Sequence, residues 1–292
     1  MNIGVIMVAI SASLAGTLGT FGTILNEAGF TGFQVAAIRM LLTSTTLLAF
    51  YPLFFSGTFQ LMRANWKLLL PHSLAGIFGF NMFFFIATEY LGITLAVALL
   101  YTAPIWVMLL ARVVLGEQSD WVRWGLALCA VLGVVFILNA QGSGINLSLF
   151  GLMFGFASAV GYAIFAVLGK IALSKLTANQ LLFSAFTIGI PVLLLFPQTW
   201  QALSQLSQTT EFKIWGSFFA VGWLGTILIN VFYMRGLKRI SASTATVITT
   251  VEPLVATILA VFVVGEILSI TQYLGVVLIV LSATLIGLRE GK

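Results

Sequence analysis

Residues 102–117 read TAPIWVMLLARVVLGE, and residues 251–266 read VEPLVATILAVFVVGE, 149 positions later. Both stretches are largely apolar, both carry a proline at the third position, and both end in Gly-Glu. The same displacement relates Asn81 to Asn230. A fixed internal period in a very apolar chain indicates a duplicated membrane unit, and paired halves of this kind are typical of secondary transporters.

The composition indicates that the solvent of this chain is lipid. Hydrophobic residues make up 60% of the 292 positions and charged residues only 7%, with a mean hydropathy of +1.12. Soluble domains carry about 25% charged residues. The 13 Lys and Arg against 8 Asp and Glu fit basic cytoplasmic loops. No basic run is present, so we expect no nucleic-acid partner.

The chain is long enough for ten membrane-spanning helices, because about 20 apolar residues cross a bilayer core. We predict an all-α integral membrane protein built as two five-helix inverted repeats. Residues 1–140 form the first repeat and residues 149–292 the second, joined by residues 141–148 (QGSGINLS). The predicted spans are 3–25, 32–55, 67–88, 93–115, 121–139, 149–171, 179–197, 213–235, 242–264 and 270–288.

The distribution of Lys and Arg predicts the orientation. With the N-terminus inside, roughly eleven basic residues lie at cytoplasmic loops and span ends, and only Lys213 lies outside. Both termini are therefore predicted to be cytoplasmic. Because each repeat holds an odd number of spans, the second repeat is upside down relative to the first, which suits alternating access to a midplane cavity.

Several motifs resemble a known family. Val251-Glu252-Pro253-Leu254, Ala103-Pro104, the two Gly-Glu pairs and the small-residue run GLMFGFASAVGY at 151–162 are similar to the drug/metabolite transporter superfamily, EamA type. The resemblance covers nearly the whole chain. It implies a ten-helix fold in the bacterial inner membrane, a cavity lined mainly by spans 1, 3, 4, 6, 8 and 9, and peripheral spans 5 and 10. Members often carry a Trp before the glycine of the first helix, where this chain has Ser13-Leu14-Ala15-Gly16.

Glu252 is the acidic residue predicted nearest to the midplane. A carboxyl group there costs roughly 2.5 to 3.5 kcal/mol on the insertion scale, so it should face a partner or water. Pro253 frees the backbone carbonyl of Thr249, and Pro104 does the same to Leu100 in the other half. Two helix breaks at related depths predict a substrate or ion site with a gating role for the prolines. The alternative is a structural kink beside a neutral Glu.

Further candidates lie inside other spans. Arg39 is the one basic residue away from a span end, and it either pairs with Glu252, binds a carboxylate or extends to the headgroups. Asn81 and Asn230 present amides within apolar spans, either to the cavity or to a neighbouring helix. His72 lies about one turn inside the cytoplasmic end of span 3, either as a gate or proton relay or, more simply, as a solvated side chain.

Aromatic residues complete the predicted cavity wall. Trp223, Thr226, Asn230 and Tyr233 recur at three- and four-residue spacing and so share one helix face. Tyr101 and Tyr162 lie near midspan, away from the interfacial belts where Tyr is usually found, and either line the cavity or pack in the core. The predicted substrate-binding residues are Arg39, Asn81, Tyr101, Tyr162, Trp223, Asn230, Tyr233 and Glu252.

These residues favour a carrier for a small organic solute. Tyrosines, amides, one acid and one base match an amino acid or a related zwitterionic or aromatic metabolite. The resemblance implies export, often by proton exchange, with protonation of Glu252 alternating with solute binding. An uncoupled facilitator, or an importer of a small metabolite or organic cation, is the alternative. A channel is separated from a carrier by saturable counterflow in liposomes.

An enzyme is the competing class and is disfavoured. One His, one Asp and one Cys supply neither a metal cluster nor an oriented nucleophile for a lipid-modifying reaction. The prediction therefore includes no catalytic residue, no metal and no cofactor. The partners expected are a small-molecule substrate, membrane lipids and protons. Two fused halves can complete one cavity, so a monomer suffices.

Overall fold

The computed structural model describes residues 2–138, 148–259 and 269–290, and the elements assigned in these ranges are helices. The first half contains α1 (Ile3–Gly16), α2 (Leu18–Glu27), α3 (Gly32–Ala49), α4 (Tyr51–Phe54), α5 (Thr58–Ala64), α6 (Trp66–Ser73), the π-helix η1 (Leu74–Gly79), α7 (Phe80–Leu91), α8 (Ile93–Leu100), α9 (Ala103–Val114) and α10 (Trp121–Leu138). The second half contains α11 (Leu149–Ala172), α12 (Ala178–Leu194), α13 (Pro197–Gln208), α14 (Phe212–Phe219), the π-helix η3 (Ala220–Leu228), α15 (Ile229–Leu237), α16 (Ala242–Thr249), α17 (Val251–Leu259) and α18 (Ile270–Arg289).

Within these described ranges, nine helical stretches are long and apolar enough to cross a membrane. They correspond to nine of the ten predicted spans. The tenth corresponds to α12, which meets the same test only together with α13, and α13 is bent from it by 94°. The residue before a proline is biased away from helical geometry, and Phe196 before Pro197 is extended, with ψ of 123°. The predicted all-helical membrane fold is confirmed.

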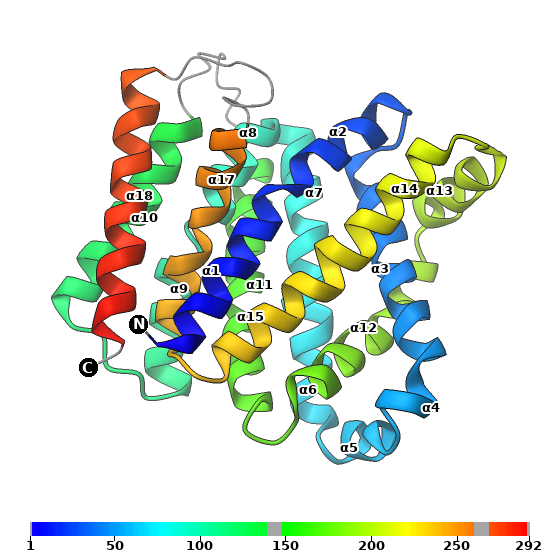
Figure 1. Cartoon of the computed structure of the whole chain (residues 1–292), viewed down its shortest axis with the longest axis horizontal. Helices are drawn as coiled ribbons and strands as arrows, with labels where there is room; N and C mark the ends of the chain where they lie inside the picture. Colours follow the sequence, from blue (N-terminus) through cyan, green and yellow to red (C-terminus); the bar gives the residue numbers. More distant parts are fainter. Residues whose placement is uncertain (1, 139–147, 260–268, 291–292) are drawn as a thin grey trace.

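The two halves run in opposite directions (Figure 1). Helix α1 begins at the end of the molecule that also holds the end of α18, which we call the termini end, and α11 begins at the opposite end. The predicted joint at 141–148 lies outside the described residues except for Ser148. The Ser148 hydroxyl accepts a hydrogen bond from the Gly151 amide at 3.3 Å and so caps α11.

Equivalent helices of the two halves begin with equivalent local sequences. Thr31 and Gln34 form a reciprocal capping box at the start of α3, and Thr177 and Gln180 form the same box at the start of α12. In each box the Thr hydroxyl and the Gln side chain satisfy two backbone amides that the helix leaves free. The displacement here is 146 positions instead of 149. The duplication is therefore visible in capping as well as in the proline motifs.

The two halves pack together through their first helices, each of which lies against a helix of the other half. Helix α1 packs against α15, and its counterpart α11 packs against α7. At the first crossing Gly4 lies against Gly236, and at the second Gly151 lies against Leu91, so a side chain on either Gly4 or Gly151 would collide with its neighbour. Small residues let membrane helices approach closely. These crossings place the first helix of each half in the middle of the bundle.

Helices α10 and α18 form a separate pair at the edge of the bundle (Figure 1). Gly133 and Gly275 meet where they cross, and a Cβ on either glycine would meet the backbone oxygen of the other. Neither helix contributes to the cavity described below. The peripheral position implied for spans 5 and 10 is therefore the one observed.

Candidate functional site

A cavity of about 480 Å³ lies between the two halves. Most of its lining comes from α1 with α2, η1 with α7, α8 with α9, α11, η3 with α15 and α16 with α17, which are the spans expected from the resemblance. Helix α12 adds Phe186. Helix α3 adds Arg39 and Met40 to this wall. The lining extends as far as Asn26 and Gly32, at the end of the molecule away from the termini.

Two broken helices shape the cavity at equivalent places. The break between α8 and α9 precedes Pro104, and the break between α16 and α17 precedes Pro253. A threonine hydroxyl donates to a backbone carbonyl beside each break, from Thr102 to Leu99 at 2.6 Å and from Thr250 to Val247 at 2.7 Å. The carbonyls that the prolines themselves leave without a helical donor are those of Leu100 and Thr249, in the same turns. Pro104 lines the cavity, whereas Pro253 is buried outside its lining.

The amides predicted from the repeat occupy matching positions. Asn81 donates to the Ile77 carbonyl at 2.7 Å, and Asn230 donates to the Thr226 carbonyl at 2.8 Å. Asn81 follows η1, and Asn230 lies at the start of the helix that follows η3. The two π-helical segments are therefore repeat-related, and π turns are frequent at functional sites. Both side chains line the cavity.

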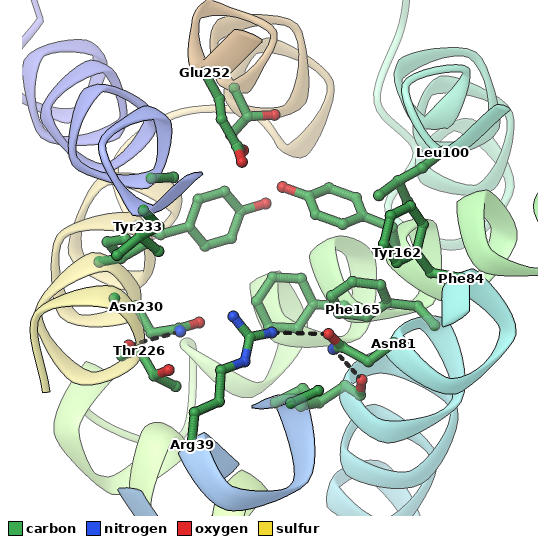
Figure 2. Close-up of a pocket in the computed structure, with 18 of the residues that line it drawn as sticks. Arg39, Asn81, Phe84, Leu100, Tyr162, Phe165, Thr226, Asn230, Tyr233 and Glu252 are labelled. Carbon is green, nitrogen blue, oxygen red and sulfur yellow. Dashed lines mark hydrogen bonds between the residues drawn. The ribbon is translucent and has the colours of Figure 1, made fainter. Parts of the chain in front are cut away.

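Arg39 belongs to the cavity wall and is bonded there. Its Nη2 donates to Oδ1 of Asn81 at 2.9 Å, while its buried Nε has no hydrogen-bond partner in the structure. Arg39 therefore points inward and does not extend to the headgroups. Figure 2 shows Arg39 and Glu252 on opposite sides of the cavity, with Tyr162 and Tyr233 between them. In this conformation Arg39 bonds to Asn81, and no ion pair with Glu252 is formed.

Glu252 is surrounded by tyrosines. Tyr101, Tyr162 and Tyr233 line the same cavity as Glu252. The hydroxyls of Tyr162 and Tyr233 point toward the same space as the carboxyl group (Figure 2). A carboxyl with phenol neighbours can accept hydrogen bonds when ionised and donate one when protonated. The arrangement suits a group that changes its protonation state or binds a cation.

Aromatic rings line the part of the cavity nearest the termini end. Phe165 stacks on Tyr233 with ring centroids 5.4 Å apart and an interplanar angle of 17°. Tyr162 meets Phe165 and Phe80 edge-on, at 5.7 Å in both cases. Phe165 was not among the predicted residues. It follows Tyr162 by three positions and therefore shares its helix face, which is the signal that was available in the sequence.

Trp223 does not reach the cavity. Its side chain is 45% exposed, and its Nε1 donates to the Thr46 hydroxyl at 3.0 Å. The shared face predicted for Trp223 and Asn230 assumed a regular α-helix between them. Residues from Ala220 to Leu228 instead form η3, whose wider turns change the register, and the Thr226 hydroxyl accordingly bonds the carbonyl of Val221 five residues earlier.

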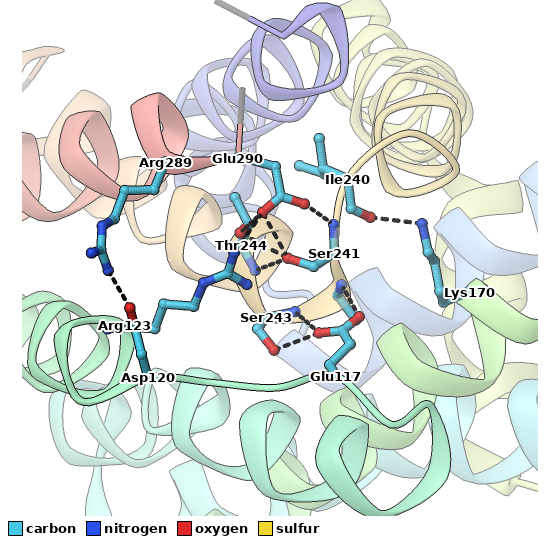
Figure 3. A network of polar contacts seen from close by, with 11 residues as sticks. Glu117, Asp120, Arg123, Lys170, Ile240, Ser241, Ser243, Thr244, Arg289 and Glu290 are labelled. Atoms are coloured by element: carbon cyan, nitrogen blue, oxygen red, sulfur yellow. Dashed lines mark hydrogen bonds and ion pairs between the residues drawn. The ribbon is translucent and has the colours of Figure 1, made fainter. Parts of the chain in front are cut away.

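A polar network surrounds the turn between α15 and α16 (Figure 3), at the termini end. The Glu117 carboxylate accepts hydrogen bonds from the Ala242 amide at 2.8 Å and from the Ser243 hydroxyl at 2.7 Å. Glu290 accepts from the hydroxyls of Ser241 at 3.0 Å and Thr244 at 2.6 Å. Carboxylates are favourable at a helix N-terminus because its free amides carry partial positive charge. Glu266, the repeat partner of Glu117, lies outside the described residues.

Lys170 completes this network from α11. Its ammonium donates to the carbonyls of Leu237 and Ile240, both at 2.7 Å, and to that of Lys238 at 3.3 Å. These carbonyls are the free acceptors at the end of α15, where a cation is favourable. We call Glu117, Lys170 and Glu290 the latch. The latch holds the α15–α16 turn against α9, α11 and α18.

An ion pair flanks the latch at the surface. Asp120 accepts from the Arg123 amide at 2.9 Å and pairs with Arg289 at 2.7 Å. The backbone hydrogen bond from Arg123, assisted by Arg289, lowers the pKa of Asp120 below its ordinary value. Both members of the pair are exposed, so the pair contributes little to stability. Among the described residues, no group of three or more His, Cys, Asp and Glu side chains is placed to hold a metal ion.

Comparison with known proteins supports the fold described above. The transporter YwfM of Bacillus subtilis (strain 168), itself uncharacterized, is 25% identical over 292 residues, covering 100% of this chain and 96% of that protein. GDP-fucose transporter 1 of Dictyostelium discoideum is 27% identical over 178 residues, covering 59% of this chain and 47% of that protein. A solved crystal structure superposes with a TM-score of 0.80 at 19% identity, covering 99% of this chain and 98% of that one.

The family match spans both repeats. The EamA-like transporter family matches residues 2–139 and 149–288, so each half matches the family separately. These ranges correspond to the two halves seen in the structure. The chain belongs to the EamA-like transporter family, whose members are multi-pass membrane transporters of small solutes.

Proposed function

We propose that this protein is a secondary transporter that moves an amino acid or a related zwitterionic or aromatic solute across the bacterial inner membrane by alternating access. The observation that carries the proposal is the cavity between the inverted halves, with a guanidinium on one wall and a carboxyl group on the opposite wall. A zwitterion presents the complementary charges at its two ends. Membrane carriers of this type bind solutes near the midplane, between their repeats.

The carboxylate of the solute would bind at Arg39. The Nε of Arg39 is buried and without a partner, and its Nη2 is positioned by Asn81. A planar guanidinium suits a carboxylate, which can accept two parallel hydrogen bonds. Asn230 adds an amide to the same cavity wall. The solute carboxylate would thus accept a hydrogen bond from Nε of Arg39. That bond would remove the free-energy cost of leaving a buried donor without a partner.

The ammonium group of the solute would bind at Glu252. The tyrosines around Glu252 supply aromatic faces and hydroxyl oxygens, which favour an organic cation. The cavity volume of about 480 Å³ lies within the usual range for small-molecule sites, about 300 to 1,000 Å³. A nucleotide sugar fits less well, because Arg39 is the only Lys or Arg among the described residues that line the cavity, and two phosphates would remain poorly compensated.

Coupling to protons would also reside at Glu252. If the carboxyl group binds either the solute ammonium or a proton, the two exclude each other, and transport of one requires return of the other. Export by proton antiport follows when protons enter down their gradient. The alternative within the same class is an uncoupled facilitator or importer, including one for an organic cation, in which Glu252 binds the solute without exchanging a proton.

The orientation proposed from the charges places the termini end in the cytoplasm. Lys170, Arg123 and Arg289 lie around the α15–α16 turn (Figure 3), and that turn is at the termini end (Figure 1). The cavity lining extends toward Asn26 at the other end, so the proposed orientation makes this an outward-facing conformation with the latch closed. One chain contributes all walls of the cavity, and we propose that the monomer is the functional unit.

Purified protein tests this function directly. A thermal-shift screen against amino acids, organic amines and nucleotide sugars identifies the solute, because a ligand that binds the folded state alone raises the melting temperature. Counterflow of that solute in proteoliposomes then separates a carrier from a channel. Stabilisation by zwitterions, but not by the matched amine or acid alone, is the expected result. Stabilisation by nucleotide sugars alone would contradict the proposed substrate class.

A further inference from the structure

His72 is the only histidine of the chain, and its side chain is completely buried. The solvated position that the sequence favoured is therefore wrong. Neither Nδ1 nor Nε2 has a hydrogen-bond partner in the structure. A neutral imidazole offers one donor and one acceptor, and leaving both unpaired in a buried place is unfavourable. Such a group calls for an explanation beyond packing in this conformation.

The imidazole lies directly behind the aromatic lining of the cavity. It stacks on Phe165 with ring centroids 5.4 Å apart and an interplanar angle of 27°, and Phe165 also stacks on Tyr233. Phe165 and Tyr233 line the cavity, whereas His72 does not. The Phe165 ring is thus in contact with both the cavity and the buried histidine.

The neighbours of His72 also connect it to the latch. A Cβ on Gly169 would lie 3.2 Å from Nε2 of His72, so the absence of a side chain there makes room for the imidazole. Gly169 precedes Lys170, whose ammonium binds the carbonyl of Leu237, and Leu237 lies beside Gly169. His72 therefore occupies the layer between the aromatic lining of the cavity and the latch.

We propose that His72 lines the passage that opens at the termini end in the opposite conformation of the transport cycle, where water or solute meets its ring nitrogens. Alternating access requires a path from the cavity to this end, and a repeat or bundle that rocks relative to the other creates it. Opening must separate α11 from α15 at the latch and uncover the ring that Phe165 shields. The two ring nitrogens of His72 then form a polar part of the wall of that passage. This inference rests on the proposed transport function.

Single-cysteine labelling tests the proposal, because Cys129 is the only native cysteine. In a Cys129→Ala background, His72→Cys is exposed to a charged, membrane-impermeant methanethiosulfonate added at the termini end of oriented vesicles. Two positions serve as matched controls: Ser174→Cys is exposed beyond α11, and Met108→Cys is fully buried in α9. Each variant is measured with and without Lys170→Met, which keeps the apolar stem and removes the ammonium of the latch.

We expect His72→Cys to react slowly with the latch intact and about tenfold faster with Lys170→Met, because a closed state often leaves the open one as a minor population. Met108→Cys should stay unreactive and Ser174→Cys unchanged. Reaction of His72→Cys from the cavity side alone, or no acceleration in a folded Lys170→Met protein, would overturn the proposal.

A second measurement uses the unaltered protein. Carbethoxylation of native His72 by diethyl pyrocarbonate, located by peptide mass spectrometry, should increase during solute counterflow. Equal modification with and without counterflow would contradict the proposal even if Lys170→Met fails to fold. Failure of the transport function is recognised separately, because counterflow would then be absent for every solute, whereas labelling of His72→Cys still reports opening at the termini end.

Discussion

Asn81 and Asn230 make the same hydrogen bond in opposite halves of the protein, each to a carbonyl four residues earlier, at 2.7 and 2.8 Å. The halves differ in what the amide oxygen meets: Asn81 accepts from Arg39, whereas the corresponding residue of α12, at the 146-position displacement of the capping boxes, is the apolar Ala185. A symmetric scaffold therefore carries an asymmetric site. An asymmetric site suits a solute whose two ends differ in charge.

Replacing Asn230 by Leu should weaken solute binding more than it weakens the fold. The amide donates within its own helix and lines the cavity, so its loss removes about 1 kcal/mol from binding, or roughly a fivefold rise in Kd. Isothermal titration gives the Kd, and thermal unfolding without solute gives the stability. An equal loss in both measurements would assign Asn230 to packing.

Replacing Arg39 by Lys should raise the Kd about tenfold or more, because a point charge cannot reproduce two parallel bonds to a carboxylate and a bond to Asn81. The amine analogue of the solute, which lacks the carboxylate, should bind wild type and Arg39→Lys equally weakly. If the amine analogue binds wild type and Arg39→Lys with different Kd values, Arg39 acts through packing and not through contact with the carboxylate of the solute.

Replacing Glu252 by Gln should abolish transport driven by a pH gradient while solute counterflow persists at a reduced rate. The amide keeps the shape of the side chain but carries no titratable proton. Fluxes in proteoliposomes with and without an imposed gradient measure the difference, with size-exclusion chromatography as the check on folding. Unchanged proton-driven flux in this variant would remove Glu252 from coupling and leave the carrier function intact.

Replacing Glu117 by Ala should loosen the start of α16. The carboxylate accepts from the Ala242 amide and the Ser243 hydroxyl, and loss of a helix cap costs about 1 kcal/mol. Hydrogen exchange at residues 242–244 should therefore become faster. Asp120→Asn is the matched control, because its exposed ion pair with Arg289 is worth about 0.2 to 1 kcal/mol at most. Equal exchange in both variants would contradict a special role for the latch.

Reporter fusions test the orientation. A reporter near Gln141 should lie on the opposite side of the membrane from one after Lys292, because an odd number of predicted spans separates them. The reporter at Lys292 should read as cytoplasmic. Both reporters on the same side would contradict the inverted arrangement in the membrane, and a periplasmic Lys292 would reverse the proposed orientation.

The sequence alone determined the membrane class, the duplication and the inverted fold. These follow from composition, from the 149-residue displacement and from the charge bias, which depend on residue type and order and not on side-chain direction. The sequence also placed helix breaks at Pro104 and beside Glu252, because the effects of a proline and of a buried carboxyl group on a membrane helix are local. The breaks before Pro104 and Pro253 occur where the motifs indicated.

Only the tertiary structure decided which side chains meet. Arg39 and Asn81 are 42 positions apart, and nothing in their spacing indicates a bond between helices α3 and α7. The π turns of η3 moved Trp223 away from Asn230, because they break the regular period from which a shared face is inferred. The burial of His72 depends on Phe165 and Gly169 from another helix. Periodicity fixes the face of a regular helix, whereas contacts between helices depend on packing that a single sequence does not display.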